Sequence, residues 1–188
     1  MNLKKYFIAV LGIFMLATVT PEIAQAQWSI GASYEIRQED PTNGFGARIE
    51  RKILTGLPIV ELGIRAHFSY FSEENNLSEG GVSYSADVTN YDYGLAATGG
   101  LPLGLLKPYI GLGLGSTTFD VNTQDLPGGD FDTSESSVFW NTFVGAELSV
   151  TPIIKPFVEY RFQQTDEPDF ATDFDSNGRM IFGLSLAF

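Results

Sequence analysis

The sequence predicts an all-β fold: an eight-stranded antiparallel up-and-down transmembrane β-barrel. Three observations predict it. Eight segments alternate between apolar and polar residues with a period of two, and no helical period persists after residue 26. The connections are alternately compact and long. One face of the segments is almost free of charge, whereas charges of both signs share the other face with many glycines. The barrel domain is expected over residues 27–188.

The N-terminal residues 1–26 have the build of a secretory signal peptide. Lys4 and Lys5 precede an apolar run at 6–18, and the small-residue sequence Ala-Gln-Ala occupies 24–26. The run is short for a permanent membrane helix and contains no cysteine that could carry a lipid. We therefore expect cleavage after residue 26 and export of the rest of the chain.

The eight strands are each close to the ~9–11 residues that cross a bilayer at a steep tilt. Their even number returns both termini to the same side of the membrane. The expected strands are 28–37, 43–53, 59–71, 88–98, 108–119, 138–149, 155–164 and 178–188.

The connections fall into two groups. One is compact, rich in Gly or Pro and free of acidic residues, whereas the other is mostly longer, carries nearly all the free carboxylates and has no Lys or Arg. This asymmetry is typical of outer-membrane barrels, with short periplasmic turns and long external loops. The compact group is 54–58, 99–107 and 150–154, and the acidic group is 38–42, 72–87, 120–137 and 165–177.

Alternation alone does not decide which face of the barrel meets water. Glycine on the polar face suits the narrow inside of a barrel, and balanced charges suit burial. Only 18% of the chain is charged, less than the ~25% of an ordinary soluble domain. We therefore expect Leu62 and Ile64 to face lipid and the charges to form a network in the lumen. The expected network is Glu35, Arg48, Glu50, Glu61, Arg65, Glu147, Glu159, Arg161 and Arg179.

The only histidine, His67, forms a His-x-Ser pair with Ser69. An imidazole beside a hydroxyl is what a serine nucleophile needs, and some lipid A deacylases carry such a pair. Here the pair shares the inward face and has no obvious acidic partner, so a structural histidine is the favoured interpretation. No catalytic residue is predicted.

One acidic loop contains the beginning of a calcium-binding pattern. Asp173, Asp175, Asn177 and Gly178 have EF-hand spacing, but the position of the closing glutamate is Leu184. An Asn-Gly turn in a solvated loop is the alternative. We predict no cofactor and no metal site.

Several positions depart from the alternation of the two faces. Arg51 points outward by phase at a strand end, where it can snorkel to headgroups. Residues 82–88 alternate in the opposite phase to 91–97, which indicates a bulge or an extramembrane extension. Large apolar residues also point inward, either packing against the glycines or lining a cavity for a hydrophobic ligand. They are Tyr109, Phe139, Phe143, Phe157 and Ile181.

Three segments together resemble the bacterial outer-membrane β-barrel family of OmpA/OmpX type, which also includes small porin-like and opacity-like barrels. They are "KPYIGLGLG" (107–115), "VGAELSVTPIIKPFVEYRF" (144–162) and "MIFGLSLAF" (180–188). The resemblance implies a Gram-negative outer membrane, contact with outer-membrane lipid and insertion by the barrel-assembly machinery. It also implies that the terminal aromatic Phe188 is the assembly signal.

The composition limits the possible partners. The net charge of −12 makes nucleic acid an improbable ligand, and a chain without cysteine forms no disulfide. The interior of eight strands is wide enough only for side chains. We therefore expect a structural or interaction protein with an unknown external partner. The alternatives are a narrow pore or hydrophobic-ligand carrier, and a lipid A-modifying enzyme.

Overall fold

The computed structural model describes residues 27–38, 41–54, 60–79, 82–124, 131–165 and 176–188. No helix in these segments is long and apolar enough to cross a bilayer. Eight strands make up the structure. They are β1 (Trp28–Arg37), β2 (Asn43–Leu54), β3 (Glu61–Glu79), β4 (Val82–Gly100), β5 (Leu106–Gln124), β6 (Phe131–Leu148), β7 (Ile154–Thr165) and β8 (Ser176–Ala187).

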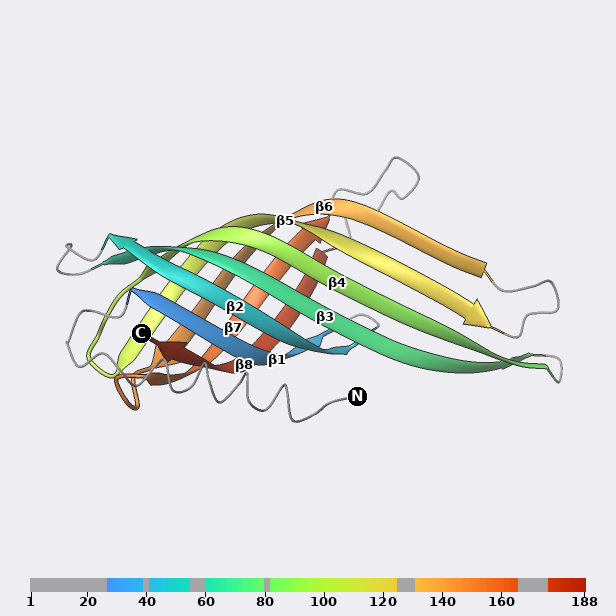
Figure 1. The fold of residues 1–188 in the computed structure, drawn as a ribbon, viewed down its shortest axis with the longest axis horizontal. Helices are drawn as coiled ribbons and strands as arrows, with labels where there is room; N and C mark the ends of the chain where they lie inside the picture. The colour runs from blue at the N-terminus through green and yellow to red at the C-terminus, as the bar shows by residue number, and fades with distance from the viewer. Residues whose placement is uncertain (1–26, 39–40, 55–59, 80–81, 125–130, 166–175) are drawn as a thin grey trace, which may run out of the picture.

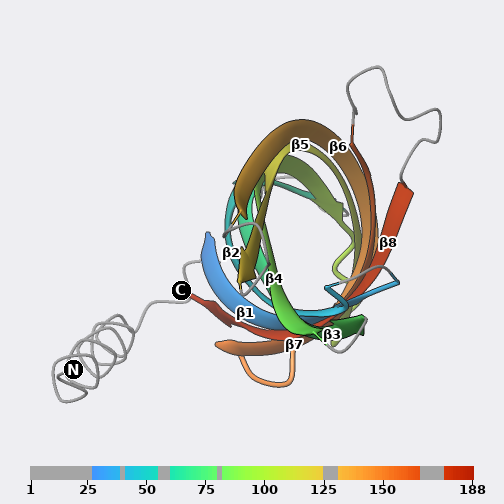
Figure 2. The same ribbon diagram turned by 90° about the vertical axis from the view of Figure 1, so that its right-hand side faces the viewer.

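The strands form a closed barrel in which each pairs with its neighbours in the chain. The ring closes where β1 pairs with β8, from Ser29 opposite Ala187 to Arg37 opposite Arg179. Figure 2 shows the ring from one end. Closure leaves no free edge at this level, which is the condition for a sheet to lie in hydrocarbon. The predicted eight-stranded antiparallel barrel is confirmed.

The two faces of the wall have the predicted orientation. Ile64 is half exposed on the outside, whereas its neighbour Arg65 is only 2% exposed on the inside. Leu95 and Leu112 likewise lie on the outer surface. Apolar side chains cover the outside because the surrounding solvent is lipid, and the polar side chains face one another across the lumen.

Four strands are at least six residues longer than predicted. β3, β4, β5 and β6 continue past the end of the closed barrel, on the right in Figure 1. The expectation of loops over 72–87 and 120–137 was therefore wrong for most of those residues. Antiparallel pairing continues to Glu79 opposite Val82 and to Thr123 opposite Phe131. These extensions were missed because most of their residues are polar and because residues 82–88 alternate in the opposite phase to 91–97.

We call this projecting region the loop-end sheet: 72–79 of β3, 82–89 of β4, 117–124 of β5 and 131–138 of β6. Its register with the barrel is continuous, from Glu61 opposite Gly100 outward. The change of phase in β4 therefore reflects an extramembrane extension, and the bulge interpretation was wrong. The one register shift recorded in the described strands lies between Lys52 and Leu54 of β2.

At the other end the connections are short, as predicted. A tight turn joins β4 to β5 and contains Gly104, whose φ of 71° lies in the left-handed region that favours glycine. Trp28 and Phe188 exchange two backbone hydrogen bonds at this end, which we call the turn end. Both described ends of the chain therefore lie there.

Candidate functional site

The nine charged residues expected in the lumen all come from inward positions of the strands. Seven are at most 7% exposed, while Glu50 and Glu61 retain partly exposed side chains. They divide into three layers along the barrel axis: a central layer, a turn-end layer and a loop-side layer.

Glu159 of β7 is the centre of the central layer. Its carboxylate lies 2.6 Å from Arg65 Nη1, 2.7 Å from Arg161 Nη2 and 3.7 Å from Arg48 Nη1. The Tyr109 hydroxyl donates a fourth contact at 3.0 Å. Arg65 also contacts Glu50 at 2.7 Å. A carboxylate buried to this degree requires such partners, because an unpaired charge is costly away from water.

The turn-end layer joins two carboxylates to three lysines. Lys52 lies 3.0 Å from Glu61, and Lys107 lies 3.2 Å from Glu147 and 3.6 Å from Glu61. Lys155 lies 3.7 Å from Glu147. The sequence prediction of the network omitted all three lysines, although each flanks a compact turn at an inward position. That position was the signal that could have identified them.

Arg179 organises the loop-side layer. Its guanidinium lies 2.7 Å from Asp92 Oδ2 and 3.5 Å from Glu35 Oε2, and it donates to Gln163 Oε1 at 2.8 Å. The predicted network lacked Asp92, although its inward phase was evident from the alternation. Charges from β1, β4 and β8 meet here. Because β4 lies across the ring from β1 and β8, these contacts span the lumen.

Large inward rings pack against glycines on neighbouring strands. Gly111 lies directly opposite Phe143, whose ring occupies the space that a Cβ on Gly111 would need. The five apolar inward residues are between 1% and 6% exposed, which supports the packing interpretation of these side chains. The same pairing recurs as Gly145 opposite Tyr109, Gly115 opposite Phe139, and Gly183 opposite Phe157.

The rings also contact the cations of the lumen. The Arg48 guanidinium lies 3.4 Å from the centroid of Phe157, and Arg65 lies 4.7 Å from that of Phe143. Cation–π contact strengthens when water is excluded, as it is here. Aromatic and ionic residues therefore form one packed interior.

His67 and Ser69 are both buried in the lumen, and each bonds a different residue. His67 Nε2 lies 3.3 Å from Asn141 Nδ2, while the Ser69 hydroxyl donates to Glu35 Oε1 at 3.1 Å. The imidazole also lies against Gly94, where an added Cβ would be 2.7 Å from its Cε1. In this arrangement both side chains belong to the inner face of the wall.

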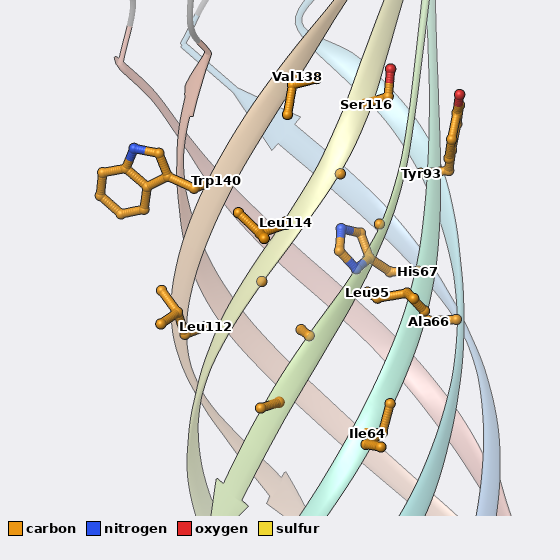
Figure 3. A pocket seen from close by; sticks show the side chains of 15 residues that line it. Ile64, Ala66, His67, Tyr93, Leu95, Leu112, Leu114, Ser116, Val138 and Trp140 are labelled. Carbon is orange, nitrogen blue, oxygen red and sulfur yellow. The ribbon is translucent and has the colours of Figure 1, made fainter.

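A hollow of about 1000 Å³ opens on the outer surface, over β3 to β6. Figure 3 shows Leu112, Leu114 and Trp140 on its side of the wall. His67 borders it because Gly94 leaves the wall thin at that point. The hollow lies among lipid-facing side chains, so it is distinct from the lumen.

The calcium candidates fall only partly within the described residues. Asp173 and Asp175 lie outside them, whereas Asn177 and Gly178 belong to β8 and pair with Gln163 and Phe162. Among the described residues, no group of three or more His, Asp or Glu side chains has an arrangement that could hold a metal ion.

Comparisons with known proteins agree with this architecture. A family model described as "Outer membrane protein beta-barrel domain" matches residues 7–188. A search of curated proteins finds no match. Similar solved structures include Neisserial surface protein A, with 18% identity, a TM-score of 0.56, and coverage of 86% of this chain and 96% of that chain.

Two further structures share the fold. Ail of Yersinia pestis, solved with the heparin analogue sucrose octasulfate, has 16% identity and a TM-score of 0.55, covering 86% of this chain and 96% of that one. A major outer membrane protein of Thermus thermophilus has 12% identity and a TM-score of 0.64, covering 86% and 98%.

The family match spans nearly the whole chain and agrees with the closed ring of strands, the apolar exterior and the ion-paired lumen. The chain therefore belongs to the outer-membrane protein β-barrel domain family.

Proposed function

We propose that this chain is a non-enzymatic interaction protein of the outer membrane, with the loop-end sheet as its binding surface. The barrel anchors this sheet, and the packed lumen acts as a structural core that does not conduct. The proposal places the loop-end sheet outside the cell, as expected for the long connections of such barrels.

The observation that carries the proposal is the open edge on each side of the loop-end sheet. In the described part of the chain, β3 pairs with β2 only as far as Phe71, and β6 pairs with β7 only as far as Phe139. Beyond those residues, each outer strand has one described partner, β4 or β5. Unpaired backbone groups at a sheet edge can accept an extended segment from another protein.

The sequence of this region favours a basic partner. Residues 72–87 and 120–137 contain no Lys or Arg and are rich in Asp and Glu. A segment with positive side chains would gain both backbone hydrogen bonds and favourable charge contacts. A polyanion such as the sucrose octasulfate in the Ail structure would instead require positive side chains, which residues 72–87 and 120–137 lack.

Two matched peptides test edge pairing directly. One alternates lysine and valine and can form a strand, and the other has the same sequence with every second amide N-methylated. We expect vesicles containing the protein to bind the first peptide and to bind the second much more weakly. Equal binding of both would show that charge alone acts and would contradict the proposed pairing.

A shortened variant localises the binding. Phe119 pairs with Glu135, and Glu73 pairs with Val88, so an Asn-Gly turn can replace 120–134 and 74–87 without changing the register. We expect this variant to lose peptide binding. A second variant, with the acids of these two segments changed to amides, should bind weakly but retain its preference for the unmethylated peptide.

The alternatives have their own measurements. Steady single-channel openings in planar bilayers, lost in Arg65→Ala, would favour the narrow pore. A changed lipid A profile on expression, abolished by Ser69→Ala, would favour the enzyme. We expect neither result, because Arg65 bridges two carboxylates across the lumen and Ser69 is bonded to Glu35.

A further inference from the structure

Arg51 is an exception on the outer surface of the barrel. In the described part of the closed wall, it is the only charged residue at an outward-facing position. Its cross-strand neighbours are Trp28 on β1 and Ile64 on β3. A charge beside lipid is costly unless it reaches the headgroups, so its position near the turn end is significant.

The surroundings of Arg51 provide an aromatic contact. Its guanidinium lies 5.2 Å from the centroid of the Trp28 ring, which is itself 39% exposed. None of the ion pairs found among the described residues includes Arg51, whereas the other described lysines and arginines of the closed wall lie inside it.

Phe188 extends this surface on the other side of Trp28. Trp28 and Phe188 exchange backbone hydrogen bonds of 3.0 and 2.9 Å, so both lie at the same level of the wall as Arg51. Phe188 is 56% exposed. Aromatic side chains at this level mark the membrane interface, where headgroup phosphates lie.

We propose that Arg51 and Trp28 form a binding site for the phosphodiester group of an anionic phospholipid in the leaflet at the turn end. The planar guanidinium offers several donors to phosphate oxygens, and the indole ring holds it in position. Trp28 and Phe188 contact the glycerol and upper acyl region beside it. The ligand is a lipid rather than free phosphate, because this surface is apolar around the single cation.

Native mass spectrometry of the detergent-solubilised full barrel tests the site with phosphatidylglycerol and phosphatidylcholine as probes. We expect phosphatidylglycerol to bind more tightly, and Arg51→Gln to weaken it about fivefold, the effect expected for one cation near the interface. Arg51→Lys and Trp28→Leu should each weaken it less. Inorganic phosphate should not displace the lipid.

Two matched variants separate this site from general effects. Lys155→Gln removes a cation inside the barrel at the same end, and Phe45→Leu removes an outward aromatic side chain near the other end. We expect both to bind phosphatidylglycerol like the unchanged protein. Equal weakening by Lys155→Gln, unchanged binding in Arg51→Gln, or displacement by inorganic phosphate would each overturn the proposal.

A second measurement checks that the variants remain folded and places the lipid. Trp28 and Trp140 are the only tryptophans, so Trp140→Phe leaves Trp28 as the single fluorophore. Its emission should shift on addition of phosphatidylglycerol, and the shift should disappear when Arg51→Gln is added. Heat-modifiable gel mobility confirms a closed barrel in each variant, and a shift that persists without Arg51 would contradict the site.

Discussion

Strands β3 to β6 belong both to the closed barrel and to the loop-end sheet, but the edges of the two regions differ. Within the closed part, β1 pairs with β8 and completes the ring. In the loop-end sheet, β3 and β6 each have a partner on one side only among the described residues. The backbone ladder of β3 and β4 passes from one region to the other without a register shift.

The difference lies in the solvent. Hydrocarbon cannot bond to a free N–H or C=O group, so the sheet must close there, whereas water satisfies an open edge. The side chains follow the same rule. Glu159 is 1% exposed and contacts three arginines, whereas Glu135 in the loop-end sheet is exposed. Stability should therefore depend on the lumen, and binding on the sheet.

The largest expected effect is the loss of the central carboxylate. Glu159→Gln would leave Arg65, Arg161 and Arg48 without their shared counter-charge in a buried site. We expect the free energy of unfolding in lipid vesicles, measured by urea titration, to fall by about 3–5 kcal/mol. Glu50→Gln is the control, because Glu50 is more exposed and, among the described residues, forms an ion pair with Arg65 alone. Equal losses would contradict the central role of Glu159.

The next effect tests the packing of rings against glycines. In Gly111→Val, the new side chain would occupy the space of the Phe143 ring, and we expect a loss of about 1–3 kcal/mol by the same titration. Gly99→Ala is the control, since its nearest neighbour is Leu62 Cδ2 at an ordinary 3.6 Å. A loss in Gly99→Ala as large as that in Gly111→Val would contradict the packing argument.

Glu159 and Gly111 also show which features of the barrel the sequence could predict. A period of two was sufficient to place Glu159 and Gly111 on the inward face, because hydrocarbon on one side and ion pairs on the other make the two sets of side chains different. The contact between Gly111 and Phe143 depends on the register between β5 and β6. Register depends on turn geometry and strand length, which the alternation does not determine.

The ends of the strands could not be predicted for a related reason. Beyond Phe71 and Phe119 most residues of β3, β5 and β6 are polar, and residues 82–88 of β4 alternate in the opposite phase to 91–97, so these segments resemble loops. The lysines at the turn end were missed because their ion pairs join strands that are distant in sequence. Lys107, for example, contacts Glu61 of β3 and Glu147 of β6.

A smaller effect is expected at the edge of the lumen. Lys155 Nζ lies 3.7 Å from Glu147 Oε1, where Lys107 also contacts that carboxylate at 3.2 Å. Lys155→Gln should therefore lower the free energy of unfolding by less than about 1 kcal/mol, and added salt should reduce the difference further. A loss comparable to that of Glu159→Gln would mean that this end is sealed from water as tightly as the centre.

The smallest effect on stability should come from the largest change in sequence. The shortened variant, with Asn-Gly turns in place of 74–87 and 120–134, retains Glu73, whose carboxylate accepts a hydrogen bond from the Thr42 amide. We expect its free energy of unfolding to stay within about 0.5 kcal/mol of the unchanged protein, as for surface changes in general.

Amide hydrogen exchange should show the reason: protection in the loop-end sheet should be lower than in the closed ring, because local opening there need not disrupt the ring. If shortening instead destabilised the barrel by several kcal/mol, the two regions would form one cooperative unit, and the loop-end sheet would be part of the core rather than a surface that the barrel carries.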